Sequence, residues 1–304
     1  MTSTAGPSQQ GLARSLLADP GFGPLPALLL ILTAVSGVVD AVSILSLGRV
    51  FVANMTGNVV FVGFAIAGAP GFSLSASLFA LAGFLAGAAA GGALISRSGR
   101  DRAVLLRAGV AAEVILAVAA LVLAALSGAP GVSHGMAAMS GGAFGAAATD
   151  ALAALLAIAM GIQNAVARKL AVPDMTTTVL TMTLTGLAAD LRAEIRGGAN
   201  RTAARAALGR RLLAIAAMLI GAITGALLVL SVSPLSGLIL ATALLAVVTI
   251  GAQAAVRWWK GAPSRAELAP HLGRGLHDEL ELGFLVIDGQ RVALHGRGEA
   301  TLAG

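Results

Sequence analysis

Six long apolar runs restrict the fold of this chain more than any other feature of its sequence. Each is long enough to cross about 30 Å of hydrocarbon, which takes roughly 20 helical residues. Backbone amides inside a bilayer must be paired within the protein, so runs of this kind form helices. The predicted spans are Pro24 to Leu47, Leu74 to Ile95, Ala103 to Leu126, Ala151 to Ala167, Leu212 to Leu230 and Leu235 to Val256.

Composition supports the same fold class. Hydrophobic residues make up 57% of the chain and charged residues 11%, which excludes a soluble globular domain. The 39 glycines allow helices to approach closely, as packing in a bilayer requires. The alternating ten-residue strands of a β-barrel are missing from the sequence. The absence of cysteine excludes disulfides and thiolate metal sites. We therefore expect an all-α membrane protein.

Two further apolar pieces, Met55 to Ala67 and Met175 to Leu187, are too short or too polar to be comfortable spans. Basic residues indicate how they lie, because the loops that carry Lys and Arg face the cytoplasm. Three regions are rich in Lys and Arg: the link after the second span, the link before the fifth span, and the segment after the last span. The links from Ser127 to Asp150 and from Ser231 to Pro234 have no basic residue and are predicted to lie outside.

The links before and after each short piece are assigned to the same face of the membrane. Both short pieces are therefore predicted to be re-entrant half-helices, which enter and leave on one face. The piece from Met55 to Ala67 would enter from outside, and the piece from Met175 to Leu187 from the cytoplasm. Arg49 is the exception to the charge rule, because this arrangement places it outside. If the first piece crossed the membrane fully, the first half would have to be redrawn.

The two halves also repeat in sequence. The stretch from Gly37 to Ser43 (GVVDAVS) matches Gly161 to Ala167 (GIQNAVA), and Asn54 to Val59 (NMTGNV) matches Asp174 to Val179 (DMTTTV). Each half then consists of a span, a half-helix and two further spans. Three crossings is an odd number, so the second copy is predicted to be inverted, as in many transporters and channels.

These features divide the chain into five parts. Residues 1–23 are a predicted disordered cytoplasmic N-terminus without a signal-peptide cleavage site. The first membrane repeat is 24–127, the outer loop 128–150 and the second membrane repeat 151–257. Residues 258–304 are a cytoplasmic tail, in which Asp288-Gly289 favours the turn of a small β-hairpin. Both termini would be cytoplasmic.

Polar residues inside the apolar segments are the candidates for a solute or ion path. Asn54 and Asp174 begin the two short pieces, where their side chains can cap free backbone N–H groups. These polar residues are either caps only, or they surround two half-helix N-termini that bind a polar or anionic solute near the midplane. The candidates are Asp40, Asn54, Thr56, Asn58, Glu113, Gln163, Asn164, Asp174, Thr176 and Thr178.

Two of these candidates are acidic residues within spans, where a carboxyl group by default indicates a function. Asp40 would couple transport to a proton or cation, or else would be a structural partner of Arg49 or of a half-helix. Glu113 would face a cavity or pair with a basic residue. Asn164, beside Gln163, is the neutral repeat mate of Asp40.

No set of residues suggests catalysis, so we expect that the protein is not an enzyme. The four histidines lie far apart, no metal-ligand spacing occurs, and no P-loop indicates an ATP-driven pump. No cofactor is expected. The arginine clusters flank spans, which favours a role in topology over a nucleic-acid surface. The expected partners are the lipid bilayer, a small polar or anionic solute and, as an open alternative, a second copy of the chain.

Three stretches carry a family resemblance: Ser36 to Ser43, Gly48 to Asn58 with its Asn-Met-Thr-Gly-Asn block, and Gly161 to Asn164 with the later Met175 to Thr178. Together they resemble the YoaK family of bacterial inner-membrane proteins over about residues 24 to 257. The resemblance implies about six spans and no assigned substrate. Our first functional hypothesis is a secondary transporter or channel. The second is a membrane scaffold or assembly partner, and an intramembrane enzyme ranks third.

Overall fold

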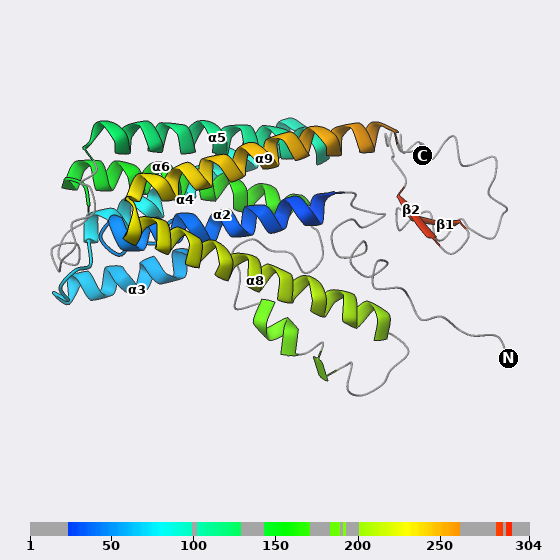
Figure 1. Ribbon diagram of the computed structural model, residues 1–304, viewed down its shortest axis with the longest axis horizontal. Helices are drawn as coiled ribbons and strands as arrows, with labels where there is room; N and C mark the ends of the chain where they lie inside the picture. The colour runs from blue at the N-terminus through cyan, green and yellow to red at the C-terminus, as the bar shows by residue number, and fades with distance from the viewer. Residues whose placement is uncertain are drawn as a thin grey trace, which may run out of the picture.

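The structure, a computed structural model, describes the backbone of residues 24–98, 102–128, 143–170, 183–188, 191–192, 201–261, 284–287 and 290–293. Its long elements are helices. In chain order they are α2 (Leu25–Ser46), α3 (Met55–Ile66), α4 (Leu74–Ser98), α5 (Arg102–Leu126), α6 (Ala146–Leu170), α8 (Arg201–Ser231) and α9 (Pro234–Gly261). Figure 1 shows the six longest lying roughly along one axis, with the short α3 at one end.

Six helices are long and apolar enough to cross a membrane: α2, α4, α5, α6, the part of α8 from Ala207 to Ser231, and the part of α9 from Pro234 to Gln253. The six predicted spans are confirmed, and the protein is a multi-pass α-helical membrane protein. Except for α2, which lies within its predicted run, the helices extend further than the apolar runs, because polar residues outside the hydrocarbon can continue a helix. The extension is largest in α8, which begins 11 residues before the predicted Leu212.

Two pairs of parallel helices are in close backbone contact through glycines. In the first pair, α4 packs on α6: a Cβ added at Gly87 would meet the backbone oxygen of Ile158, and one at Gly161 that of Phe84. In the second pair, α8 packs on α2: a Cβ at Gly221 would meet the backbone oxygen of Ala34. Small residues at such positions let two helix backbones approach, which is how membrane helices gain packing energy.

The remaining long helices complete two groups of three. Helix α5 packs on α6 and, more weakly, on α4, while α9 packs on α2 and α8. One group is therefore α4, α5 and α6, and the other is α2, α8 and α9. The groups meet where α5 packs on α9 and where α2 crosses α6. Each group contains the first span of one half of the chain and the last two spans of the other half.

The basic residues lie at one end of this bundle. Helices α4, α6 and α9 end there, and α5 and α8 begin there (Figure 1). The helix termini at this end include Arg97, Arg102, Arg168, Lys169 and Arg201. At the opposite end, the described part of the chain has a single basic residue, Arg49. The charges thus follow the distribution on which the sequence-based topology was built.

Helix α3 packs on α4 and is too short to span a bilayer, because 12 residues cover about 18 Å. The loop before it begins beside the loop that follows it: the backbone N–H of Ser73 donates to the oxygen of Gly48 over 3.3 Å. In the C-terminal region, β1 (Phe284–Ile287) pairs antiparallel with β2 (Gln290–Ala293), with Ile287 opposite Gln290. This register places the predicted Asp288-Gly289 pair between the two strands.

Candidate functional site

Asp40, six residues before the end of α2, holds the non-helical segment that precedes α3 against that helix. Its Oδ1 accepts hydrogen bonds from the backbone N–H groups of Val52, at 3.1 Å, and Ala53, at 2.9 Å. The side chain is 5% exposed. A non-helical segment inside an apolar bundle has no helix or ladder partner for its amides, so a carboxylate oxygen supplies the acceptor. Of the two structural roles predicted for Asp40, the structure shows the second. Asp40 bonds to the backbone that leads into α3, and it is not paired with Arg49.

Asn58 anchors the same segment from the other side. Its Oδ1 accepts a hydrogen bond from the N–H of Phe51 at 2.8 Å, and its Nδ2 donates to the Phe51 oxygen at 2.6 Å. One side-chain amide thus pairs both backbone groups of Phe51, as a neighbouring strand would. Asn58 is fully buried although it lies in an apolar helix. The burial is explained by these two bonds, because a buried amide without partners would be costly.

Asn54 and Thr56 are exposed and do not join this arrangement. Asn54 occupies the N-cap position of α3, but its side chain makes no capping hydrogen bond. The prediction that Asn54 caps the helix is therefore right in position and wrong in chemistry. The physical reason is that Asn58, four residues later, ties down the preceding backbone instead.

A second polar contact joins α2 to α6 at the centre of the bundle. Gln163 is 1% exposed, and its Nε2 donates to Ser36 Oγ at 3.0 Å and to the Leu32 oxygen at 3.4 Å. Ser36 also contacts Met160, with 4.0 Å between Oγ and Sδ. Sequence reasoning missed Ser36 as a site residue. The available signal was its spacing, because residues 36 and 40 lie one turn apart on the same face of a helix.

The other two candidates in the described spans differ in their surroundings. Asn164 is half-buried, and its Nδ2 donates to the Met160 oxygen one turn earlier, at 2.8 Å. Glu113 is 1% exposed in the middle of α5. Asp174, Thr176 and Thr178 lie outside the described residues, as does most of the second short piece.

Several buried oxygens at this level have no hydrogen-bond partner among the described residues. They are Asp40 Oδ2, Gln163 Oε1 and Glu113 Oε2. A buried polar atom without a partner costs about 1 to 3 kcal/mol, and more when it is charged. All three atoms are acceptors, so a group that satisfied them would have to donate hydrogen bonds or carry positive charge. No group of three or more His, Cys, Asp or Glu that could hold a metal occurs in the described part of the chain.

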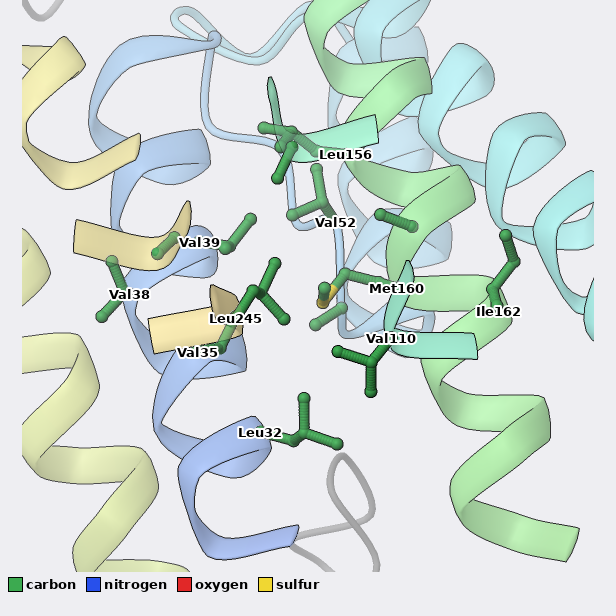
Figure 2. Close-up of a cluster of buried hydrophobic side chains, with 14 of the residues drawn as sticks. Leu32, Val35, Val38, Val39, Val52, Val110, Leu156, Met160, Ile162 and Leu245 are labelled. Atoms are coloured by element: carbon green, nitrogen blue, oxygen red, sulfur yellow. The ribbon is translucent and has the colours of Figure 1, made fainter. Parts of the chain in front are cut away.

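Apolar side chains fill the space around these polar contacts. Figure 2 shows Leu32, Val35 and Val39 of α2 facing Met160 of α6, with Val52, Val110 and Leu245 closing the gap. The labelled side chains in this gap are at most 2% exposed. The structure therefore holds the centre of the bundle in a closed, packed arrangement.

Arg49 lies at the outer end of the short segment, over aromatic rings. Its guanidinium is 5.4 Å from the centroid of Phe72, and Phe72 is 5.0 Å from Phe61, which in turn stacks on Phe51 at 5.4 Å. Arg49 has a positive φ of 58°, a conformation that non-glycine residues seldom adopt. The cation–π contact with Phe72 explains how a lone arginine is accommodated there.

Comparison with known proteins places the chain in a family. The model of a family described as proteins of unknown function, DUF1275, matches residues 28–251. The UPF0700 transmembrane protein YoaK of Bacillus subtilis (strain 168) is 34% identical over 166 residues, which are 54% of this chain and 66% of that protein. The match thus spans just under two thirds of the relative. No solved structure matches the chain. The chain belongs to the DUF1275 family, which confirms the resemblance to YoaK that its sequence motifs predicted.

Proposed function

We propose that this protein is a secondary transporter or channel for a small polar solute, with its site where α2 crosses α6. The observation that carries the proposal is the pair of buried, unpartnered acceptors Asp40 Oδ2 and Gln163 Oε1. They lie on helices from opposite halves of the chain, at the boundary between the two three-helix groups. Secondary transporters bind their substrates at such a boundary, near the bilayer midplane.

The packing of the helices supports an inverted repeat. Each first span is in parallel backbone contact with the third segment of the other half: α2 with α8, and α6 with α4. The contacts correspond residue by residue, since a Cβ at Gly37 would meet Met218 and Ala222, and one at its repeat mate Gly161 would meet Phe84 and Ala88. The end of α2 lies beside the start of α6, because Ala143 N–H donates to the Ser46 oxygen at 2.8 Å. The two first spans therefore run in opposite directions.

We further propose that the segment from Gly48 to Ser73 is re-entrant. The hydrogen bond between its two ends and the short length of α3 support this interpretation. Asp40, to which the non-helical segment is tied, is six residues from the end of α2, or about 9 Å along the helix. The chain would then dip from the outer surface to the level of Asp40 and return along α3.

The orientation follows from the basic end of the bundle. We place this end and both termini in the cytoplasm, and the protein in a bacterial inner membrane, by the rule that Lys and Arg remain inside. The end that carries Arg49 would then be outside. A function without catalysis fits the described residues, where no acid, base and nucleophile are brought together.

The chemistry of the free acceptors narrows the class of solute. Asp40 Oδ2 and Gln163 Oε1 would repel an anion and would bind a hydroxyl, amine, ammonium ion or proton. A solute that donates hydrogen bonds therefore fits this site better than the anionic solute that two half-helix N-termini would favour. Opening of the boundary between the two groups of helices would be needed to admit it, because apolar side chains fill the space (Figure 2).

The experiment is a flux and thermal-stabilisation screen of the purified protein in liposomes with polyols, sugars, amino acids, monovalent cations and small anions. Asp40→Asn is the informative variant. Its amide oxygen can still accept the N–H groups of Val52 and Ala53, so it should fold, whereas Asp40→Ala would leave both amides unpaired. We expect flux of a donor-bearing solute that Asp40→Asn reduces at least tenfold. No flux and no stabilisation by any solute would refute the proposal.

The packed centre favours a second candidate, a membrane scaffold that transports nothing. A scaffold needs no path to the midplane, and the close packing around Leu32, Met160 and Leu245 provides none (Figure 2). This candidate predicts that another membrane protein co-purifies with the full chain and is lost when residues 263–304 are deleted. It also predicts that neither the wild-type protein nor Asp40→Asn gives solute flux.

A further inference from the structure

Glu113 has surroundings that the proposed solute site does not explain. It lies 11 residues from the start of α5 and 13 from its end, or about 17 and 20 Å along the helix. This position is near the middle of a bilayer. The side chain is 1% exposed and one carboxyl oxygen has no hydrogen-bond partner in the described part of the protein. A buried acid at this depth costs folding free energy, and such residues by default indicate a function.

The charged groups on the neighbouring helices lie toward the helix ends, and Arg107, on α5 itself, is exposed and about 9 Å before Glu113 along the helix. On α4 the described charged residue is Arg97, at the basic end. On α6 they are Asp150 at one end and Arg168 and Lys169 at the other. Helix α9 has no charged residue between Pro234 and Gln253. An ionised Glu113 would therefore have no described cation to balance it, and such a charge costs several kcal/mol. A carboxylic acid avoids this cost and supplies an O–H donor.

The helix register places a suitable acceptor at the same level. A Cβ at Gly109 of α5 would lie 2.9 Å from a Val166 methyl group of α6. Because α5 and α6 run antiparallel (Figure 1), one turn further along α5 lies opposite one turn earlier in α6. Glu113 is thus level with Ile162 and Gln163. Gln163 Oε1 is the buried acceptor without a partner, and its Nε2 leads on to Ser36, one turn from Asp40.

We propose that Glu113 is a proton-binding group and that Glu113, Gln163, Ser36 and Asp40 form a polar line through the bundle. The proton would bond to a Glu113 carboxylate oxygen and be released from it during the cycle, with no other bond changed. This inference deepens the proposed function and rests on it, because it makes the transporter proton-coupled. Gln163 and Ser36 would act as positioning residues that keep the line polar between two carboxyl groups.

The first test is infrared difference spectroscopy of the full-length protein in nanodiscs during a pH titration. A protonated carboxyl group has its own C=O band. We expect a band that is lost in Glu113→Gln and kept in Asp150→Asn, the control that removes an acid hydrogen-bonded by Ser75 at the outer end of α6. If Glu113→Gln fails to fold, Glu113→Leu provides the same comparison, since an apolar side chain suits this buried face. Spectra unchanged by both substitutions would overturn the inference.

The second test separates this inference from the proposed function. Proteoliposomes loaded with the pH indicator pyranine report proton movement when a transported solute is added. We expect Glu113→Gln to reduce proton flux at least tenfold and Asp150→Asn to leave it unchanged. Wild-type solute flux with equal proton flux in Glu113→Gln would refute proton binding at Glu113 and leave the transporter in place. A Glu113 carboxyl band in a protein that moves no solute would instead refute the proposed function.

Discussion

Asn58, and Asp40 with one of its two oxygens, show how a polar side chain in a membrane interior can serve the backbone. Together they pair three backbone N–H groups and one carbonyl of residues 51–53, which no strand or helix satisfies. Each unpaired amide in hydrocarbon would cost several kcal/mol, so these two side chains make the non-helical segment possible. Asp40 has one oxygen without a partner, and this atom distinguishes it from Asn58, whose Oδ1 and Nδ2 both bond to the Phe51 backbone.

The two asparagines of the Asn-Met-Thr-Gly-Asn block should therefore differ sharply on substitution. Asn58→Ala removes both partners of the Phe51 backbone and should lower the free energy of unfolding by about 3 kcal/mol. Asn54→Ala should change it by less than about 0.5 kcal/mol, because that side chain is exposed and makes no capping bond. Thermal unfolding in detergent micelles measures both. Equal effects at the two positions would contradict the assignment of the anchor to Asn58.

At the scale of helices, glycine position determines which pairs of helices come together. Gly83, Gly87 and Gly91 form one row on α4, and all three face α6. Gly92 lies next to this row and has no atom within 4 Å of the place where a Cβ would be. The same residue type thus has opposite energetic roles one position apart. In the row it permits backbone contact, and outside the row it only weakens the helix.

Alanine substitutions should accordingly have opposite signs at neighbouring glycines. Gly87→Ala puts a methyl group against the backbone of Ile158 and should destabilise the protein by about 1 to 3 kcal/mol. Gly92→Ala meets nothing and should stabilise it by up to about 1 kcal/mol, since alanine favours a helix more than glycine does. Midpoints of thermal unfolding in matched detergent provide the comparison. A stabilising Gly87→Ala would refute the close contact between α4 and α6.

The segment from Gly48 to Ser73 makes a prediction that uses the absence of native cysteine. A Cβ at Gly48 would lie 3.1 Å from the Ser73 Cβ, just below the range of about 3.5 to 4.5 Å found in disulfides, so a small outward shift of the loop brings the pair into that range. The double variant Gly48→Cys/Ser73→Cys should form a disulfide on mild oxidation, despite the strain of a cysteine at a positive φ. Mass spectrometry of the digested protein detects the link. Gly48→Cys/Ser96→Cys, with residues at opposite ends of the bundle, is the control that should remain reduced.

For the whole molecule, the features that the lipid environment determines could be predicted from the sequence. The features that depend on contacts between helices could not. The six spans followed from hydropathy because a bilayer leaves few alternatives to a helix. The bond between Gln163 and Ser36 could not be predicted, because it depends on where two helices far apart in sequence cross. The same limit explains Asn54: local chemistry indicated a cap, whereas the folded loop uses Asn58. The pairing of β1 with β2 was predictable, since an Asp-Gly pair acts within a few residues.

Orientation in the membrane is the largest prediction that the charge distribution supports. Single cysteines placed in this cysteine-free chain report it directly, through labelling of intact cells with a membrane-impermeant maleimide. Ser127→Cys follows α5 at the end opposite the Arg cluster, so it should be labelled from outside. Ser96→Cys lies beside Arg97 at the basic end and should be labelled only after the membrane is permeabilised. The reverse result would invert the whole molecule and place Arg49 and its aromatic ring cluster in the cytoplasm. Labelling of both sites in intact cells would mean that the chain inserts in two orientations, as a weak charge bias at the first span would allow.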